Sequence, residues 1–315
     1  MQKKKQIILV NRCGRLANRL VFFANFAALA EELNCSVVNC TFHSYAAFFE
    51  NTRKDIYCRY PASSQQSLWD MVPGVSNTIR ETRLFYHMIR TASNIQEKWS
   101  LGGSSIVTLH EPCNPDQSVT SLEKREVLDR ISDGDIIFIK GWKFRAPKWV
   151  KKHAESIRDY FQPIEQFDQS ARLAIDDLRK NGDIAIAIHI RRGDYRKWNS
   201  GRYYFSIEQY RRWMHELVEQ FQGSRVAFLV CSDEQRSPDE FPGLTVRLGP
   251  GTPMGDMHAM AQCDWICGPL STFTQWSSFY GAKPLFHLRN SNDHLELPNF
   301  EISYLDEVPG HPLPE

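Results

Sequence analysis

Short runs of apolar, β-branched residues alternate along the chain with longer stretches of helical periodicity. The first run covers residues 7–10, and a turn around Gly14 separates it from residues 19–33, whose apolar side chains recur at helical spacing. Residues 36–40 form the next apolar run. Because a strand, a turn, a helix and another strand form the unit from which parallel sheets are built, this segment predicts an α/β domain.

The middle of the chain has a weaker pattern. Between residues 41 and 132 we expect only a helix around residues 85–96, and a strand at 134–142 closes the first half. Residues 148–163 then show helical spacing that stops at Pro163, because proline cannot continue a helix. The boundary between two domains is expected near this point.

The second half alternates regularly between strands and helices. A helix is predicted at 167–182, and a second begins with a capping box formed by Ser206 and Gln209. Strands are predicted at 183–190, 225–233, 244–248, 264–267 and 283–288, and further helices at 206–223, 254–263 and 271–281. This alternation is typical of a doubly wound sheet. We therefore expect two Rossmann-like domains, residues 1–165 and 166–315, with parallel sheets facing a central cleft.

Composition narrows the possible functions. The chain has 315 residues, 42% of them hydrophobic, and a formal net charge of +1, so it can bury a core and offers no global charge for nucleic acid. The apolar run after the basic residues at the start is too short for a signal peptide or a membrane span. The sequence therefore predicts a soluble, cytoplasmic protein. Eight scattered cysteines without a CxxC pair are expected to be buried free thiols, with no zinc site.

Three junctions between a strand and a helix carry the candidate chemistry, because ligands of open parallel sheets bind beyond the carboxyl ends of strands. The first is "CGRLAN", where Gly14 allows close backbone approach and Asn18 lies in the first helical turn. A phosphate or sugar oxygen could bind at this helix start. A tight turn without any ligand explains the same residues equally well.

The second junction, "HIRRGDY", contains two arginines that differ in phase. Alternation along the strand places His189 and Arg191 on one face and Arg192 on the other. We expect Arg191 to bind a phosphate and Arg192 to be a surface residue paired with Asp194. His189 is either a ligand contact or a core histidine, and Asp194 is either a general base or a structural partner of an arginine.

The third junction, "CGPLSTFTQW", places two hydroxyls at a helix start. One of Ser271 and Thr272 is expected to cap the helix, which leaves the other for a phosphate oxygen. Asp256 lies at the start of the preceding helix and is either a ligand contact or that helix's cap. The basic and aromatic stretch "KGWKFRAPKWVKK" favours a solvated helix face over sugar stacking or peripheral contact with a membrane surface.

Together these motifs resemble the fucosyltransferase superfamily of GT-B fold. "CGRLANRL", "HIRRGDY", "VCSDE" and "DMHAMAQCDWICGPLSTFTQW" match in order, and "YYFSIEQY" makes the bacterial α-1,2-fucosyltransferases the nearest branch, related to the α-1,6- and protein O-fucosyltransferases. The chain departs from the family pattern at Ala17, Arg19, Pro269 and Leu270. These departures leave open which sugar is transferred.

The resemblance implies an inverting glycosyltransferase of polysaccharide biosynthesis that moves fucose from GDP-fucose to a hydroxyl of a glycan or lipid-linked oligosaccharide. The second domain would bind the nucleotide-sugar donor and the first the acceptor, with no metal or other cofactor required. Arg191 would hold the β-phosphate, His189 and Asp256 guanine or ribose, and Ser271 or Thr272 a phosphate oxygen, while the turn from Gly14 to Asn18 would approach the reacting sugar. Another GDP-sugar, or a non-catalytic GDP-sugar or glycan-binding protein, are the alternatives.

Overall fold

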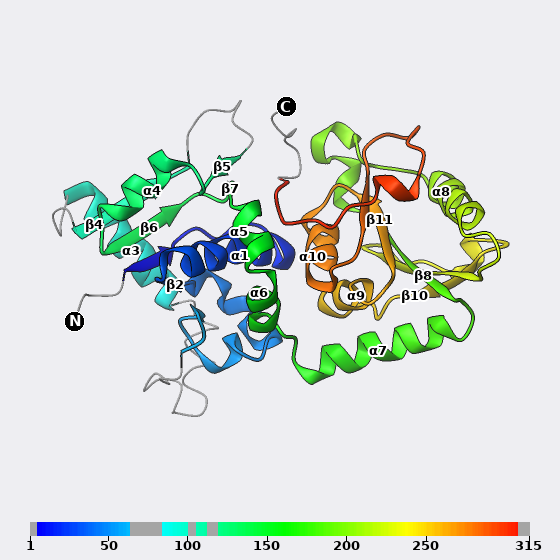
Figure 1. Cartoon of the computed structure of the whole chain (residues 1–315), viewed down its shortest axis with the longest axis horizontal. Coiled ribbons are helices and arrows are strands. Elements are labelled where there is room, and N and C mark those ends of the chain that lie inside the picture. The colour runs from blue at the N-terminus through cyan, green and yellow to red at the C-terminus, as the bar shows by residue number, and fades with distance from the viewer. Residues whose placement is uncertain (1–4, 64–83, 100–104, 112–118, 308–315) are drawn as a thin grey trace. The chain divides into compact units, whose positions relative to one another are not determined.

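The structure is a computed structural model that describes residues 5–63, 84–99, 105–111 and 119–307 (Figure 1). The chain divides into two compact units between Ile164 and Glu165, one residue before the expected boundary. Unit 2 ends at Tyr304, and the described residues 305–307 group with unit 1. The expected second domain, 166–315, therefore extends past the end of unit 2.

Unit 1 is built on a five-stranded sheet in the order β3-β2-β1-β6-β4. Its strands are β1 (Gln6–Leu9), β2 (Ser36–Val38), β3 (Arg59–Tyr60), β4 (Ile106–His110) and β6 (Ile136–Lys140). All neighbours pair in parallel except β2 and β3. Helices α3 (Leu84–Trp99) and α4 (Arg125–Ser132) precede β4 and β6, so the helical pattern expected around residues 85–96 is confirmed.

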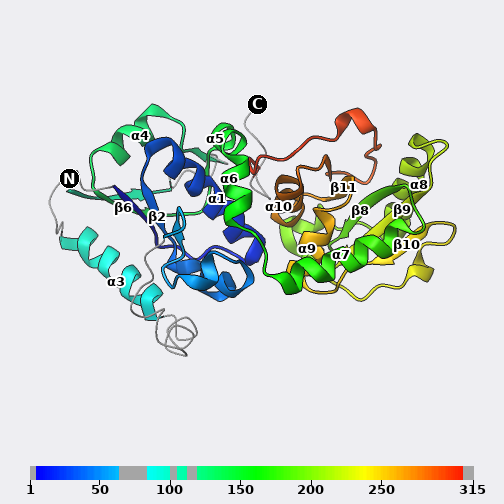
Figure 2. The same cartoon turned by 60° about the horizontal axis from the view of Figure 1, so that its bottom comes forward.

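Helix α1 (Leu16–Leu33) is apolar on nearly all sides and forms the centre of the core of unit 1. Phe22, Phe23 and Phe26 are almost fully buried and make edge-to-face contacts with other aromatic rings. A helix that is hydrophobic all round must be covered on every side. Helices α5 (Pro147–Lys152) and α6 (Ala154–Tyr160) lie beside it and provide part of this cover (Figure 2).

Three local predictions in unit 1 differ from the structure. The helix expected at 148–163 is interrupted at His153, which has non-helical dihedral angles and whose imidazole contacts Glu32 of α1 at 2.5 Å. The strand expected at 36–40 ends at Val38 and continues as a 3-10 helix. Strand β4 and the small sheet of β5 (Thr120–Ser121) and β7 (Phe144–Arg145) were not predicted, because short segments carry too little periodicity.

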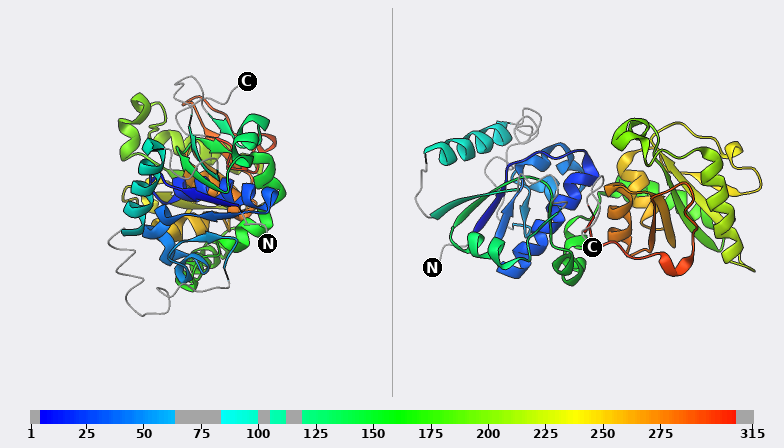
Figure 3. Two further views of the ribbon diagram at one scale, coloured as in Figure 1. Left: turned by 90° about the vertical axis from the view of Figure 1, so that its left-hand side faces the viewer. Right: turned by 90° about the horizontal axis from the view of Figure 1, so that it is seen from above.

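Unit 2 follows the predicted alternation closely. Its sheet, in the order β10-β9-β8-β11-β12, is parallel throughout. The strands are β8 (Ile184–Ile190), β9 (Val226–Ser232), β10 (Thr245–Leu248), β11 (Trp265–Pro269) and β12 (Leu285–Leu288), and the helices are α7 (Glu165–Arg179), α8 (Ile207–Gln220), α9 (Pro253–Met260) and α10 (Thr272–Gly281). Figure 3 shows helices packed against the sheet of each unit. The predicted capping box of Ser206 and Gln209 starts α8.

The central strand β8 has different residues on its two faces. Ile186, Ile188 and Ile190 pack in the cluster that contains α8, whereas Ala185 and Ala187 pack in the cluster that contains α7 and α9. Small alanines on one face allow two helices to approach the sheet closely. His189 continues the alanine face, so the predicted phase of this strand is confirmed.

Candidate active site

The topology of unit 2 brings the ends of β8 and β11 together. From β8 the chain moves to β9 and β10 on one side of the sheet and then to β11 and β12 on the other. Such a reversal is where open parallel sheets bind ligands. The two loops at this point are joined by Tyr195, whose hydroxyl donates a hydrogen bond to the carbonyl of Leu270 at 2.8 Å.

Arg191 lies directly after β8 and is held by Asp194. Its Nε and Nη2 donate to the two carboxylate oxygens at 3.0 and 2.7 Å, and its guanidinium lies over the Tyr195 ring, 5.2 Å from the centroid. The expected pair of Arg192 with Asp194 is therefore wrong. The short 3-10 turn from Asp194 to Arg196 returns the carboxylate toward the end of the strand, where Arg191 is nearer.

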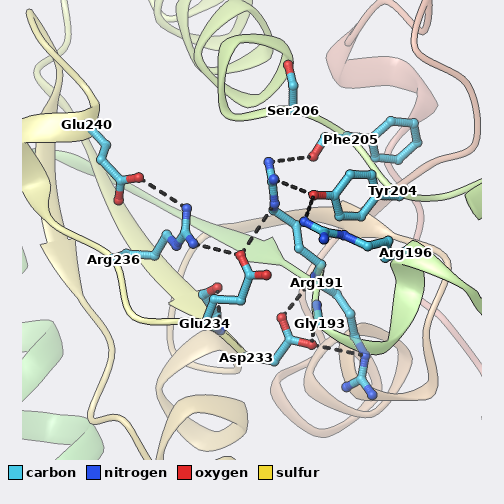
Figure 4. A network of polar contacts seen from close by, with 12 residues as sticks. Arg191, Gly193, Arg196, Tyr204, Phe205, Ser206, Asp233, Glu234, Arg236 and Glu240 are labelled. Carbon is cyan, nitrogen blue, oxygen red and sulfur yellow. Dashed lines mark hydrogen bonds and ion pairs between the residues drawn. The ribbon is translucent and has the colours of Figure 1, made fainter.

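The Arg192 side chain has other partners than Arg191 does, namely Tyr204, Phe205 and Glu234, which Figure 4 shows. Its Nη1 donates to the Phe205 carbonyl at 3.2 Å, its Nη2 donates to the Tyr204 hydroxyl at 2.5 Å, and its Nε lies 3.4 Å from Glu234. Arg236 then joins Glu234 to Glu240. These contacts agree with the expectation that Arg192 supports the turn rather than a ligand.

Asp233 is a structural residue of this site that the sequence did not single out. Its carboxylate accepts hydrogen bonds from the backbone N–H groups of Arg192 and Gly193 at 2.9 and 3.2 Å. It thereby fixes the backbone directly after Arg191. The signal was present in "VCSDE", which ends β9, the neighbour of β8 in the sheet.

His189 is buried behind Arg191, with 3% of its surface exposed. Its ring stacks on Phe273 of α10 with a centroid separation of 4.7 Å. Burial and then the Arg191 charge lower the pKa of His189 to about 3, so the imidazole is neutral at physiological pH. Its Nδ1 has no hydrogen-bond partner among the residues that the structure describes. A neutral ring with an unpaired nitrogen can donate or accept one hydrogen bond to a ligand.

Asp256 is a buried carboxylate and does not cap α9. The cap is Thr252, whose hydroxyl accepts a hydrogen bond from the N–H of Gly255. Asp256 lies in the first turn, where one oxygen accepts from the N–H of Gly251 at 2.7 Å. Burial raises its pKa to about 6. The cap alternative is therefore wrong, and the role of this carboxylate as a ligand contact stays a prediction.

Ser271 caps α10, as expected for one of the two hydroxyls. Its Oγ accepts hydrogen bonds from the N–H groups of Phe273 and Thr274 at 3.1 and 3.3 Å. Thr272 is the first residue of the helix and is 7% exposed. Within unit 2 the fold thus brings His189, Arg191 and the start of α10 to one edge of the sheet.

Gly14 and Asn18 form a tight turn at the end of β1 in unit 1. Gly14 has φ of +48°, and a Cβ at this position would lie 1.9 Å from Nδ2 of Asn18. Only glycine fits here, because the backbone is left-handed and Asn18 covers it. Arg19 supports the turn by donating to the carbonyls of Gly14 and Thr41. Arg15, at the N-cap of α1, provides no side-chain cap.

A cavity of about 610 Å³ lies in unit 2 next to the end of β12. None of the predicted site residues lines it. Its lining consists of Arg202, Tyr204, Phe205, Gln209, Arg289, Asn290, Ser291, Asn292 and Asp293.

The described residues contain no cluster of three or more metal-ligating side chains. In the same part of the chain, no helix is both long and apolar enough to cross a bilayer. Seven cysteines lie in this part, all of them buried and outside any disulfide of the described residues, while Cys113 lies outside the described residues.

Comparisons with known proteins show a similarity to glycosyltransferases in part of the sequence and in the fold. Residues 148–298 match glycosyl transferase family 11. No curated protein sequence matches the chain. The structure is similar to a variant of Arabidopsis thaliana FUT1 in complex with GDP, with 12% identity and a TM-score of 0.56 over 95% of this chain and 74% of that one.

Bacterial structures show the same fold. The fucosyltransferase NodZ from Bradyrhizobium has 14% identity and a TM-score of 0.53, over 90% of this chain and 96% of that one. The NodZ α-1,6-fucosyltransferase soaked with GDP-fucose has 14% identity and a TM-score of 0.51, over 93% and 98%. The α/β fold with parallel sheets is therefore that of the GT-B fucosyltransferases. The likeness to these structures is one of fold, and the family 11 match covers residues 148–298, which include most of unit 2.

Proposed function

We propose that this protein transfers fucose from GDP-fucose to a hydroxyl of a glycan acceptor with inversion at the anomeric carbon. The observation that carries this proposal is the position of Arg191. Arg191 directly follows the central strand of unit 2, two residues after His189, whose ring stacks on Phe273 near the start of α10. One similar structure is in complex with GDP and another was soaked with GDP-fucose, which supports a GDP-sugar as the donor.

Arg191 binds the diphosphate and neutralises the negative charge that develops as GDP leaves. Its Nη1 makes no hydrogen bond to the described residues, so we assign this nitrogen to a phosphate oxygen. The backbone N–H groups at the start of α10 add partial positive charge, with Ser271 or Thr272 contributing a hydroxyl. Loss of one such electrostatic contact costs about 2.7–4 kcal/mol in comparable enzyme sites.

His189 and Asp256 bind the nucleoside. The neutral imidazole of His189 offers one donor or acceptor, and the Asp256 carboxylate can accept from the N–H groups of guanine or from ribose hydroxyls. Guanine presents adjacent N–H donors, and hydrogen bonds from these donors explain the presence of the buried Asp256 carboxylate. This pair therefore supports guanine over uracil as the base.

The reaction needs little more than positioning and charge. The bond between the anomeric carbon and the β-phosphate oxygen breaks, the acceptor oxygen attacks from the opposite face, and the acceptor proton passes to a base or to solvent. Gly14 and Asn18 of unit 1 contact the reacting sugar or the acceptor, a glycan or lipid-linked oligosaccharide. The mechanism requires no metal.

Asp194 has two possible roles, general base or partner of Arg191. Both of its oxygens accept from Arg191, which supports the partner role, because a carboxylate in a bidentate pair is a weak base. Asp194→Asn distinguishes them. A partner role predicts turnover within a few-fold of wild type with a raised KM for the donor, whereas an essential base predicts a loss of about 10²–10⁴-fold in kcat.

The donor is tested with thermal shift and hydrolysis across a panel of nucleotide sugars. We expect GDP and GDP-fucose to raise the Tm, and the rise to disappear in Arg191→Ala. The matched control is Arg211→Ala, because Arg211 lies on the outer part of α8 and pairs with no described residue other than Glu208. Stronger stabilisation by UDP-sugars than by GDP-fucose would contradict the donor assignment.

Two alternatives remain within the same fold. Ala17, Arg19, Pro269 and Leu270 depart from the family pattern near both predicted sites, and these departures favour a different GDP-sugar as the first alternative. The second is a binding protein without activity. Turnover of another GDP-sugar in the panel would support the first, and GDP binding without turnover of any donor would support the second.

A further inference from the structure

Unit 1 has its own point of strand reversal, between β1 and β6. The chain leaves β1 for β2 on one side of the sheet, and β6 pairs with β1 on the other side. Open parallel sheets bind ligands at such a point. The segment after β6 leads directly to Arg145, in the short strand β7.

Arg145 is a buried cation whose guanidinium lies over the Trp142 ring, 5.2 Å from its centroid, and makes hydrogen bonds through one end only. It is 1% exposed, and its Nη1 donates to the carbonyls of Trp142 and Phe144, each at 2.8 Å. The next residue is also fixed, because the N–H of Ala146 donates to the Asn25 side chain of α1 at 2.6 Å. Burial lowers the pKa of Arg145 to about 10, which leaves the guanidinium charged at neutral pH.

The other edge of this guanidinium has no partner. Nε and Nη2 are both buried and make no hydrogen bond to any described residue. These two atoms form the edge with which Arg191 holds Asp194 in unit 2. Each buried donor left unpaired destabilises the folded protein by about 1–3 kcal/mol. Because this edge has the geometry that binds a carboxylate or a phosphate, such a ligand would remove that cost.

Carboxylates act on this charge only from beyond ion-pair distance. Cys13, Asp306 and Glu111 act on Arg145 electrostatically, but none of the described carboxylates lies within 4.0 Å of it. Burial raises the pKa of the Cys13 thiol to about 11, so Cys13 is neutral. The Glu111 carboxylate accepts from the N–H groups of Trp142 and Lys143 at 2.7 and 3.2 Å.

We propose that the Nε and Nη2 edge of Arg145 binds an oxyanion, the carboxylate or phosphate of an acidic acceptor glycan. The assignment to the acceptor rests on the proposed function, whereas the oxyanion chemistry does not. The long helix α1 begins nearby without a side-chain cap, so its first N–H groups favour the same charge. Because the edge is closed to solvent, the ligand enters through a local opening.

Binding to the full chain tests this proposal. The probes are methyl β-glucuronide, its neutral match methyl β-glucoside, inorganic phosphate and GDP, each followed by thermal shift. We expect the glucuronide to raise the Tm and the glucoside to leave it unchanged, with phosphate competing against the glucuronide. Arg145→Lys should abolish the glucuronide shift and keep the GDP shift, whereas Arg191→Lys should do the reverse. Arg53→Lys, at an exposed position in unit 1, is the matched control.

The outcomes separate this proposal from the proposed function. A glucuronide shift that is absent in the wild type, or unchanged in Arg145→Lys, overturns the oxyanion site on the acceptor side. A phosphate shift through Arg145 without a glucuronide shift overturns the acceptor assignment. Failure of GDP to bind concerns unit 2 alone. If Arg145→Lys does not fold, crystals of the wild type soaked with glucuronide decide, since a carboxylate must lie within hydrogen-bond distance of both Nε and Nη2.

Discussion

Units 1 and 2 each have an arginine near the point where their sheet reverses direction, but the two arginines differ in whether a carboxylate of the chain pairs with them. In each, the first strand lies at the centre of a five-stranded sheet, and the chain reverses direction across it. In unit 2 the arginine at this point, Arg191, holds a carboxylate of its own chain. In unit 1 the corresponding edge of Arg145 is unpaired and more deeply buried.

The residues around each arginine decide whether its guanidinium is paired within the chain or can bind an anion. Asp194 follows Arg191 by three residues in a short 3-10 turn, so the pair forms locally and keeps the cation oriented at a partly exposed edge. Arg145 has carbonyl partners and no carboxylate within ion-pair distance among the described residues. A guanidinium that is paired with a carboxylate is held in a fixed orientation. A buried guanidinium without such a partner is stabilised by binding an anion from outside the chain.

The largest expected effect separates the two arginines that follow β8. Arg191→Lys should lower kcat/KM for GDP-fucose by about 10²–10³-fold, because lysine cannot reproduce the fork that holds Asp194 and the phosphate together. Arg192→Lys is the matched control, since Arg192 contacts Tyr204, Phe205 and Glu234. The loss of kcat/KM in Arg192→Lys should be at least tenfold smaller than in Arg191→Lys, a difference of about 1.4 kcal/mol. Equal losses in steady-state kinetics would contradict the distinction.

The next effect compares the glycines of the two turns. Gly14→Ala should destabilise the protein by about 1–3 kcal/mol, because alanine is strained in the left-handed region and would clash with Asn18. Gly193 has φ of −48°, and a Cβ at this position would contact only Asp233, whose Oδ2 would lie 3.0 Å away. Gly193→Ala should therefore cost less in a urea unfolding experiment. The reverse order would show that the turn of unit 1 is the looser one.

Asp256 gives a prediction about pH. Its folded pKa of about 6 lies above its ordinary value of 3.8, so between these values the folded state binds more protons than the unfolded state. This group's contribution to stability is present below about pH 4 and is lost as the pH rises through about 6. Asp256→Asn should flatten the Tm profile across this window and raise the Tm at pH 7.5 while weakening GDP binding. Asp176→Asn, on the exposed side of α7, should leave the profile unchanged.

The smallest effect concerns the link between the two loops of unit 2. Tyr195→Phe removes the hydrogen bond to the Leu270 carbonyl and keeps the ring beneath Arg191, so it should cost about 1 kcal/mol of stability. A KM for the donor raised a few-fold, with kcat little changed, would accompany it. Tyr203→Phe is the control, because its hydroxyl has no hydrogen bond among the described residues. An identical response of both variants would remove Tyr195 from the positioning of Arg191.

The fold of unit 2 could be predicted from the sequence because its strands and helices are long enough to show their period. "IAIAIHI" reveals both faces of β8, and the capping box at Ser206 marks the start of α8. Unit 1 was harder, since β5 and β7 have two residues each and show no period. The break at His153 was also missed, because it depends on a contact with Glu32 far away in the sequence.

The alternation of residues along β8 predicted the face on which each arginine lies, but the sequence did not predict which side chains pair. Phase alone separated Arg191 from Arg192, whereas the partner of Asp194 depended on the path of a 3-10 turn that leaves no periodic signal. Arg145 was beyond sequence reasoning for a related reason. Within "KGWKFRAPKWVKK" it looks like any other basic residue of a solvated face, and only packing around α1 buries it.

The most direct test of the account is the affinity for GDP measured by calorimetry on proteins with one arginine changed in each unit. We predict that wild type binds GDP in preference to UDP, that Arg191→Lys weakens GDP binding at least tenfold, about 1.4 kcal/mol, and that Arg145→Lys leaves it unchanged. Undiminished binding of GDP by Arg191→Lys, or equal binding of UDP by the wild type, would contradict the assignment of the donor site to unit 2.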